Sequence, residues 1–129
     1  MSRPSVPQAV GRPDRYRRQT VLDEIGAEGQ RALSGARAAV VGLGALGSIS
    51  SDLLARAGVG HLRLVDRDVV ELTNLQRQSL YSESDVDRPK AEAAAERLRF
   101  VNSEIDIEAV SKDVHSATAR EILREADIV

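Results

Sequence analysis

A glycine-rich segment followed by an acid is the first pattern in this sequence whose spacing suggests chemistry. The segment G-L-G-A-L-G spans 42–47, and Asp66 follows about 20 residues later. In a strand–turn–helix unit, Gly42 would permit the turn, Gly44 would let the backbone approach a phosphate, and Gly47 would let helix and strand pack closely. The helix N-terminus then presents free N–H groups to an anion. The pattern predicts a nucleotide site with Asp66 on the ribose.

The glycine loop does not by itself distinguish one nucleotide from another. NAD and ATP both present phosphates and a ribose, so either ligand satisfies the pattern. A glycine-rich turn before an alanine-rich helix, with no ligand, is the alternative that carries no function. The strand expected before the loop, the helix expected after it and the acid at Asp66 favour a nucleotide.

Three polar residues after Asp66 suggest what is done with the nucleotide. Transfer at phosphorus requires neutralisation of developing negative charge. Arg77 can hold phosphate oxygens through a forked pair of hydrogen bonds, Lys90 can act as a point charge, and Asn74 can orient an oxygen. Taken singly, each is equally well an ordinary solvated side chain. Lys90, however, is expected near a helix N-terminus, where the helix dipole disfavours a cation, and this favours a functional role.

Apolar runs and turn residues predict the elements that must position these groups. Alternation of strands and helices is typical of a parallel sheet with helices on both faces. We therefore expect an α/β, Rossmann-like, doubly wound fold, truncated at its C-terminal end because an apolar run at 126–129 begins another strand. The expected strands are 37–41, 61–65 and 105–110, and the expected helices are 23–33, 45–57, 89–101 and 116–125.

Composition limits the classes of function. The 129 residues suggest one domain, preceded by a flexible, proline-containing leader at 1–14. No cysteine is present, so this segment has no disulfide, thiolate metal site or thiol nucleophile. A net charge of −2 gives no bulk electrostatic reason to bind nucleic acid or an anionic membrane. No run approaches the roughly 20 apolar residues that span a bilayer, and no signal peptide is evident, so a cytoplasmic location is expected.

Together the motifs resemble one superfamily. The chain is similar to the adenylating enzymes of the ThiF, MoeB and ubiquitin-activating superfamily, most of all to bacterial enzymes that activate sulfur-carrier proteins for molybdopterin or thiamine synthesis. By this resemblance, 15–129 is the N-terminal part of an adenylation domain. The matching stretches are R-Y-R-R-Q at 15–19, V-V-G-L-G-A-L-G at 40–47, A-G-V-G at 57–60, L-V-D-R-D at 64–68, T-N-L-Q-R-Q at 73–78 and R-P-K at 88–90.

The resemblance implies a reaction and roles for residues. Such enzymes bind ATP and Mg²⁺, and the C-terminal carboxylate of a ubiquitin-like protein attacks the α-phosphate to give an acyl-adenylate and pyrophosphate. Arg18 matches an arginine that reaches the ATP of the other subunit of a homodimer, although a solvated basic arm is its simpler interpretation. The nucleotide-binding positions implied are Gly42, Gly44, Ala45, Gly47, Asp66, Thr73, Asn74, Arg77 and Lys90, and the catalytic ones are Arg18, Asn74, Arg77 and Lys90.

Departures from the family pattern also matter. Ala45 and Asp87 stand where the family often has glycine. The family's magnesium-binding aspartate would lie beyond Val129, as would the two C-x-x-C pairs that hold structural zinc in many members. No metal ligand is therefore assigned within these residues, and we expect the 129 residues alone to be weak or inactive in catalysis.

Three alternatives stay open. The chain can belong to an NAD-dependent oxidoreductase, to a non-catalytic partner subunit of the same fold, or to a relative that adenylates a modified tRNA base. Asp68 is either at the rim of the site or a solvated loop acid. The residues read as structural, although their side chains can do chemistry elsewhere, are Ser48, Ser50, Ser51, His61 and His115.

Overall fold

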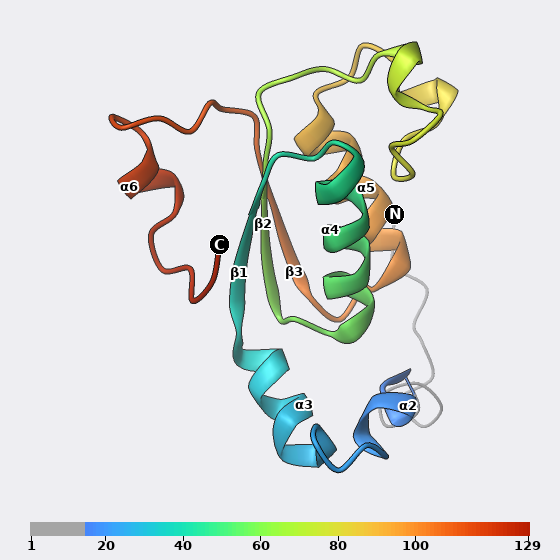
Figure 1. Ribbon diagram of the computed structural model, residues 1–129, viewed down its shortest axis with the longest axis vertical. Coiled ribbons are helices and arrows are strands. Elements are labelled where there is room, and N and C mark those ends of the chain that lie inside the picture. Colours follow the sequence, from blue (N-terminus) through green and yellow to red (C-terminus); the bar gives the residue numbers. More distant parts are fainter. Residues whose placement is uncertain (1–14) are drawn as a thin grey trace, which may run out of the picture.

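The computed structural model describes residues 15–129 and contains a parallel sheet of three strands (Figure 1). The predicted leader at 1–14 lies outside the described residues. Strands β1 (Arg37–Val41), β2 (His61–Val65) and β3 (Asp106–Val110) lie in that order. All pairs are parallel, and Val41, Val65 and Val110 are aligned at one edge. The carboxyl ends of the strands therefore meet, so the loops that follow β1 and β2 are brought together.

The last described residues extend the sheet on the free side of β1. Ala38 and Ile128 form a parallel bridge, and Ala39 N donates to Ile128 O at 3.0 Å. Along the chain, β2 and then β3 are added on one side of β1, and the last residues are added on the other side of β1. A crevice for ligands forms where the strand order reverses in this way, outside the carboxyl ends of the strands.

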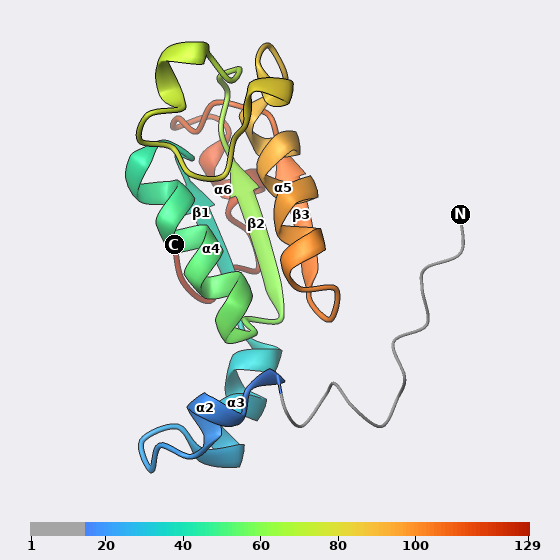
Figure 2. The same cartoon turned by 90° about the vertical axis from the view of Figure 1, so that its right-hand side faces the viewer.

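Helices cover both faces of the sheet. Helices α4 (Ala45–Ala57) and α5 (Lys90–Val101) pack on one face, and the short α6 (Ala119–Ile122) lies on the other (Figures 1 and 2). Gly58 ends α4 in the left-handed conformation, at φ +88°, as a glycine after a helix commonly does. The remaining elements are α2 (Arg17–Thr20), α3 (Gly26–Gly35) and the 3₁₀ turns η1 (Leu72–Asn74) and η2 (Glu83–Asp85). The α/β class predicted from the sequence is confirmed.

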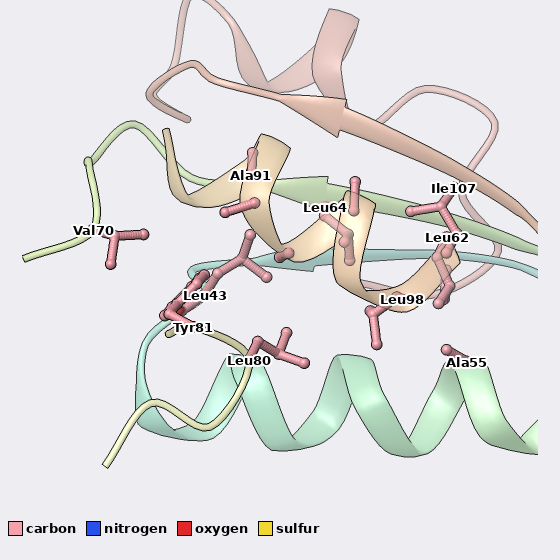
Figure 3. Close-up of a cluster of buried hydrophobic side chains, with 14 of the residues drawn as sticks. Leu43, Ala55, Leu62, Leu64, Val70, Leu80, Tyr81, Ala91, Leu98 and Ile107 are labelled. Carbon is pink, nitrogen blue, oxygen red and sulfur yellow. The ribbon is translucent and has the colours of Figure 1, made fainter. Parts of the chain in front are cut away.

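The core lies between the sheet and the face formed by α4 and α5. Leucines from both layers are fully buried, and the alanines on the inner face of α5 let that helix approach the sheet closely (Figure 3). Tyr81 is the one aromatic side chain of the cluster, so the core is almost wholly aliphatic. Its fully buried members include Leu43, Leu62, Leu64, Val70, Ala91, Ala94, Ala95 and Leu98.

Two helices begin or end elsewhere than predicted. The helix predicted at 23–33 begins at Gly26, whose φ of +58° turns the chain just before it. The helix predicted at 116–125 is confined to α6, because the Arg63 guanidinium binds the carbonyls of Ile122 and Arg124 at 2.6 and 2.8 Å. A longer helix would use those carbonyls as acceptors for its own N–H groups. Glu125, with φ at +64°, also takes the backbone out of the helical conformation.

Two smaller differences concern a short helix and the start of α5. The basic cluster at 15–19 contains the short helix α2, which the sequence did not predict. Pro89 is the N-cap of α5 and not its first helical residue. In the part of the chain that the structure describes, no helix has the length and apolarity needed to cross a bilayer.

Candidate nucleotide-binding site

The glycine loop joins β1 to α4 at the carboxyl edge of the sheet. Gly42 has φ +92°, and its N–H donates to Val65 O at 2.8 Å, so the chain turns sharply while still bound to β2. A Cβ on Gly47 would lie 1.7 Å from Gly42 O. Glycine at 47 is therefore required for α4 to begin directly against the turn. Both glycines serve the local fold before any ligand is considered.

Gly44 differs from Gly42 and Gly47, because the fold does not require a glycine at this position. A Cβ at this position would meet one side chain only, Gln78 Nε2, at an ordinary 3.8 Å. Gly44 caps α4, and no side chain caps that helix. The N–H groups of 45–47 have no hydrogen-bond partner among residues 15–129. Backbone donors and the positive end of a helix are thus left open, as in sites that bind anions.

The peptide groups of Leu43 hold the loop in place. Leu43 N donates to Asp66 Oδ2 at 2.8 Å, and Leu43 O accepts from the Tyr81 hydroxyl at 2.7 Å and from Ser48 Oγ at 3.2 Å. Burial, with the nearby Asp66 charge, raises the pKa of Tyr81 well above its ordinary value, so the hydroxyl stays protonated and donates. No sequence pattern indicated this role for Tyr81, whereas Ser48 is structural, as predicted.

Asp66 links the loop to the segment that follows β2. Its Oδ1 accepts from Asp68 N at 2.7 Å while Oδ2 holds Leu43 N. Each carboxylate oxygen has two acceptor directions, so hydroxyls of a ribose can still bind. Asp68 stands at the rim with an exposed carboxylate 3.7 Å from Arg67, and either interpretation of that acid remains open.

The predicted T-N-L-Q-R-Q segment forms η1 and the turns after it. Asn74 is buried, and its Oδ1 accepts from Glu71 N at 2.9 Å in a reciprocal capping arrangement. Arg77 is exposed, with Nη1 bound to Thr73 O at 3.1 Å. Thr73 is also exposed, its hydroxyl 3.4 Å from Glu71. The turn holds the amide inside and leaves the guanidinium accessible.

Lys90 is the first residue of α5 and lies beside residues 68–70, which follow β2. Its N–H donates to Asp68 O at 2.9 Å, and Val70 N donates to Arg88 O at 2.8 Å. The Lys90 side chain is 7% exposed, and its ammonium forms no ion pair with any residue of the described part of the chain. Asp87 turns the chain here at φ +71°, a conformation that explains the family's frequent glycine.

Arg18 lies away from the predicted residues of the glycine loop. It lies on α2, exposed, at the end of the molecule where the strands begin (Figures 1 and 2). The glycine loop is at the opposite end. Within one chain Arg18 therefore contacts no part of this site, and a role there requires a second copy.

Two hollows meet at the glycine loop. One of about 790 Å³ runs between β1 and α4, and the other, of about 200 Å³, lies beside Asp66 and the segment after β3. Val41 and Gly42 line both. A nucleotide with its ribose at Asp66 would place phosphates at the N-terminus of α4, so this arrangement defines the class as a Rossmann-like nucleotide-binding domain.

The particular family follows from comparison with known proteins. The chain belongs to the ThiF family, whose model matches residues 16–129. The sulfur carrier protein ThiS adenylyltransferase of Bacillus subtilis (strain 168) is 48% identical over 117 residues, which cover 89% of this chain and 35% of that protein. The molybdopterin-synthase adenylyltransferase of Escherichia coli (strain K12) is 44% identical over 115 residues, covering 89% of this chain and 46% of that one. The chain thus spans between a third and a half of these relatives.

Solved structures agree with the family and the fold. The E. coli tRNA N6-threonylcarbamoyladenosine dehydratase TcdA, solved in complex with ATP, matches with a TM-score of 0.81 and 31% identity over 87% of this chain and 45% of that one. E. coli MccB with ATP matches with a TM-score of 0.73 and 36% identity over 80% of this chain and 31% of that one. The superfamily predicted from the motifs is therefore confirmed.

Proposed function

We propose that this chain is the nucleotide-binding part of an enzyme that uses ATP to adenylate the C-terminal carboxylate of a ubiquitin-like sulfur-carrier protein. The two curated relatives described above are adenylyltransferases, one of them for the sulfur carrier protein ThiS, which favours ATP over the NAD of an oxidoreductase. A cytoplasmic location, where ATP is available, belongs to the same proposal.

One observation carries the proposal most directly: Lys90 is only 7% exposed, and its ammonium has no ion pair among the described residues. A buried charge is costly unless it is paired. A polyphosphate would supply the missing negative charge, and the exposed Arg77 is a second cation in the chain between β2 and α5. The charges suit a triphosphate better than a cofactor that carries only a diphosphate.

The reaction requires charge stabilisation and positioning. A carboxylate oxygen of the carrier attacks the α-phosphorus, a new O–P bond forms, and the bond to the oxygen bridging the α- and β-phosphates breaks, so that pyrophosphate leaves. The attacking carboxylate is already ionised at neutral pH, so no general base is needed. The N–H groups of 45–47, Arg77 and Lys90 would bind phosphate oxygens as charge develops, Asn74 would fix the turn or orient an oxygen, and Asp66 would hold the ribose.

Metal ions and partners are further parts of the proposal. Between residues 15 and 129, no three His, Cys, Asp or Glu side chains gather into a metal site. Mg²⁺ is typically bound through one or two carboxylates, substrate phosphates and several waters, so a carboxylate ligand would come from the aspartate expected beyond Val129. Structural zinc would be held outside these residues. A homodimer in which Arg18 of one copy reaches the ATP of the other accounts for the position of Arg18 far from its own loop.

Nucleotide titration by calorimetry tests the proposal on this chain. We expect Mg²⁺–ATP to bind more tightly than NAD, and Lys90→Met to weaken ATP binding by at least about tenfold, the loss of roughly one charge-assisted hydrogen bond. Arg56→Ala, which removes an exposed arginine of α4, is the matched control and should change nothing. Preference for NAD, unaffected by Lys90→Met, would instead identify an oxidoreductase.

Adenylation itself is tested by ATP–pyrophosphate exchange with a carrier protein that ends in two glycines. We expect little or no exchange from these 129 residues alone. Exchange at a rate typical of a whole enzyme would contradict that expectation while supporting the reaction.

A further inference from the structure

Gln78 is a buried polar side chain that the fold does not use. Only 4% of the residue is exposed, and Oε1 is buried with no hydrogen-bond partner. The side-chain amide makes no hydrogen bond to any residue between 15 and 129. Buried polar groups are nearly always paired, so an unpaired one calls for an explanation.

The backbone of Gln78, in contrast, does structural work. Its N–H donates to Asn74 O at 2.9 Å, and its carbonyl accepts from Tyr81 N at 3.4 Å. These bonds continue the turn of η1 whatever side chain follows. A methionine of similar shape would fill the same volume without leaving a buried acceptor unpaired. Packing alone therefore does not account for an amide here.

The amide is aimed at the glycine loop, with its donor end first. Gln78 Nε2 lies 3.8 Å from the point that a Cβ of Gly44 would occupy, and the space has no other neighbour within 4 Å. Gly44 caps α4, whose first N–H groups have no partner among the described residues. The helix N-terminus and the buried amide are independent features, and both present N–H donors to the same place.

We propose that Gln78 binds the nucleotide directly, by donating from Nε2 to a phosphate oxygen held at the N-terminus of α4. This inference rests on the proposed function and adds a residue to its site. Gly44 then has a second purpose: without a side chain, the loop leaves the path between Gln78 and the phosphate open. A neutral donor adds direction to the binding of the anion but no further buried charge, beside the cations Arg77 and Lys90.

Gln78→Met tests the inference, and Gln76→Met is the matched control, because Gln76 is exposed in the same segment. Both variants and the unaltered chain are titrated with Mg²⁺–ATP and with adenosine. We expect Gln78→Met to weaken ATP binding about tenfold, equivalent to about 1.4 kcal/mol, and to leave adenosine binding unchanged. Gln78→Glu replaces the donor by an acid that repels the anion, so its loss should be larger. Gln76→Met should leave both ligands unaffected.

Thermal unfolding without ligand separates binding from folding. Gln78→Met should keep or raise the Tm, because the unpaired buried acceptor is gone. Undiminished ATP binding by Gln78→Met would overturn the role of Gln78 and leave the proposed function standing. An equal loss of ATP and adenosine, or a lowered Tm, would show a packing role and also overturn it. Failure of the unaltered chain to bind ATP at all would overturn both proposals.

Discussion

Buried glutamines at the two ends of the sheet differ in how completely their side chains are paired. At the end where the strands begin, the buried amides are fully used: Gln30 Nε2 donates to Ala57 O at 3.1 Å and its Oε1 accepts from Gln19 at 2.7 Å. Asn102, fully buried, donates to Ala55 O and to the Tyr16 hydroxyl at 2.8 and 2.9 Å. The hydrogen bonds of Gln30 join α3 to α2 and α4, and those of the Asn102 amide nitrogen join the end of α5 to α4 and to Tyr16.

At the carboxyl end, two buried polar groups lack such partners. Gln78 has an unpaired carbonyl oxygen, and the Lys90 ammonium has no ion pair within the described residues. An unpaired buried polar atom costs about 1–3 kcal/mol of stability. The difference indicates that the paired amides serve the fold, whereas the Gln78 amide, whose Nε2 donor faces Gly44, is left free for a ligand.

The largest effect is expected from substituting two glycines of the same loop, one structural and one facing the ligand. Gly47→Ala should destabilise the chain by about 3 kcal/mol or more, because the new Cβ would meet Gly42 O at 1.7 Å and the backbone must move. Gly44→Ala should leave the free energy of unfolding nearly unchanged and weaken ATP binding. Urea denaturation and ATP titration of both variants measure the two effects. Equal stability of the two variants would contradict this division between a structural and a ligand-facing glycine.

Asn102→Leu tests the paired end. It removes the hydrogen bonds to Tyr16, Ala55 and Glu104, and we expect a loss of about 2–3 kcal/mol in the free energy of unfolding. Binding of ATP by the folded variant should be unchanged. Gln78→Met is the counterpart at the other end: it should keep the stability and weaken the binding of ATP. A stable Asn102→Leu would mean that pairing at this end does not hold the fold.

An intermediate effect on the free energy of unfolding is expected from pH, through Arg63, which binds the carbonyls at the end of α6. The hydrogen bond from Arg63 to Glu108, at 2.8 Å, lowers the pKa of Glu108 below its ordinary value. A depressed carboxyl pKa stabilises the fold above the unfolded pKa, about 4.3, and this contribution is lost as the pH falls through the folded value. The effect is small because Glu108 is half exposed. Glu108→Gln should remove this component from the acid limb of a pH-dependent urea titration; an unaltered acid limb would contradict the assignment.

The smallest effect is expected at Asp87, in the turn before Lys90. With φ at +71°, Asp87→Gly relieves the left-handed backbone but adds freedom to the unfolded chain, so a gain of about 0.5 kcal/mol is expected. Thermal denaturation measures it. Glu125→Gly, at φ +64°, should gain more, because aspartate tolerates this conformation better than glutamate does. A loss at Asp87 would show that its side chain, not its backbone, matters.

Local patterns were enough to predict most of the fold. β1, β2 and α4 have the predicted limits because apolar runs end there at glycines or at an acid. The length of α6 was not predictable, since it is set by Arg63, a residue some 60 positions away whose guanidinium holds the helix carbonyls. The short helix α2 was missed within a basic cluster that lacks a helical pattern.

The site shows the same limit. The glycine spacing and Asp66 were visible in the sequence because their order and spacing form a recognisable nucleotide-binding pattern. Tyr81 and Gln78 were not, because their roles depend on burial and on the chain segment opposite them. That Lys90 is buried without an ion pair is likewise a tertiary property, although its place at a helix start was a signal.

Amide hydrogen exchange with and without Mg²⁺–ATP tests the central claim, that the carboxyl end of the sheet binds the phosphates. We predict slower exchange at the amides of 45–47 on addition of ATP but not of adenosine, and unchanged exchange in α3. Protection confined to α3, or no protection at 45–47 when ATP is bound, would contradict the claim.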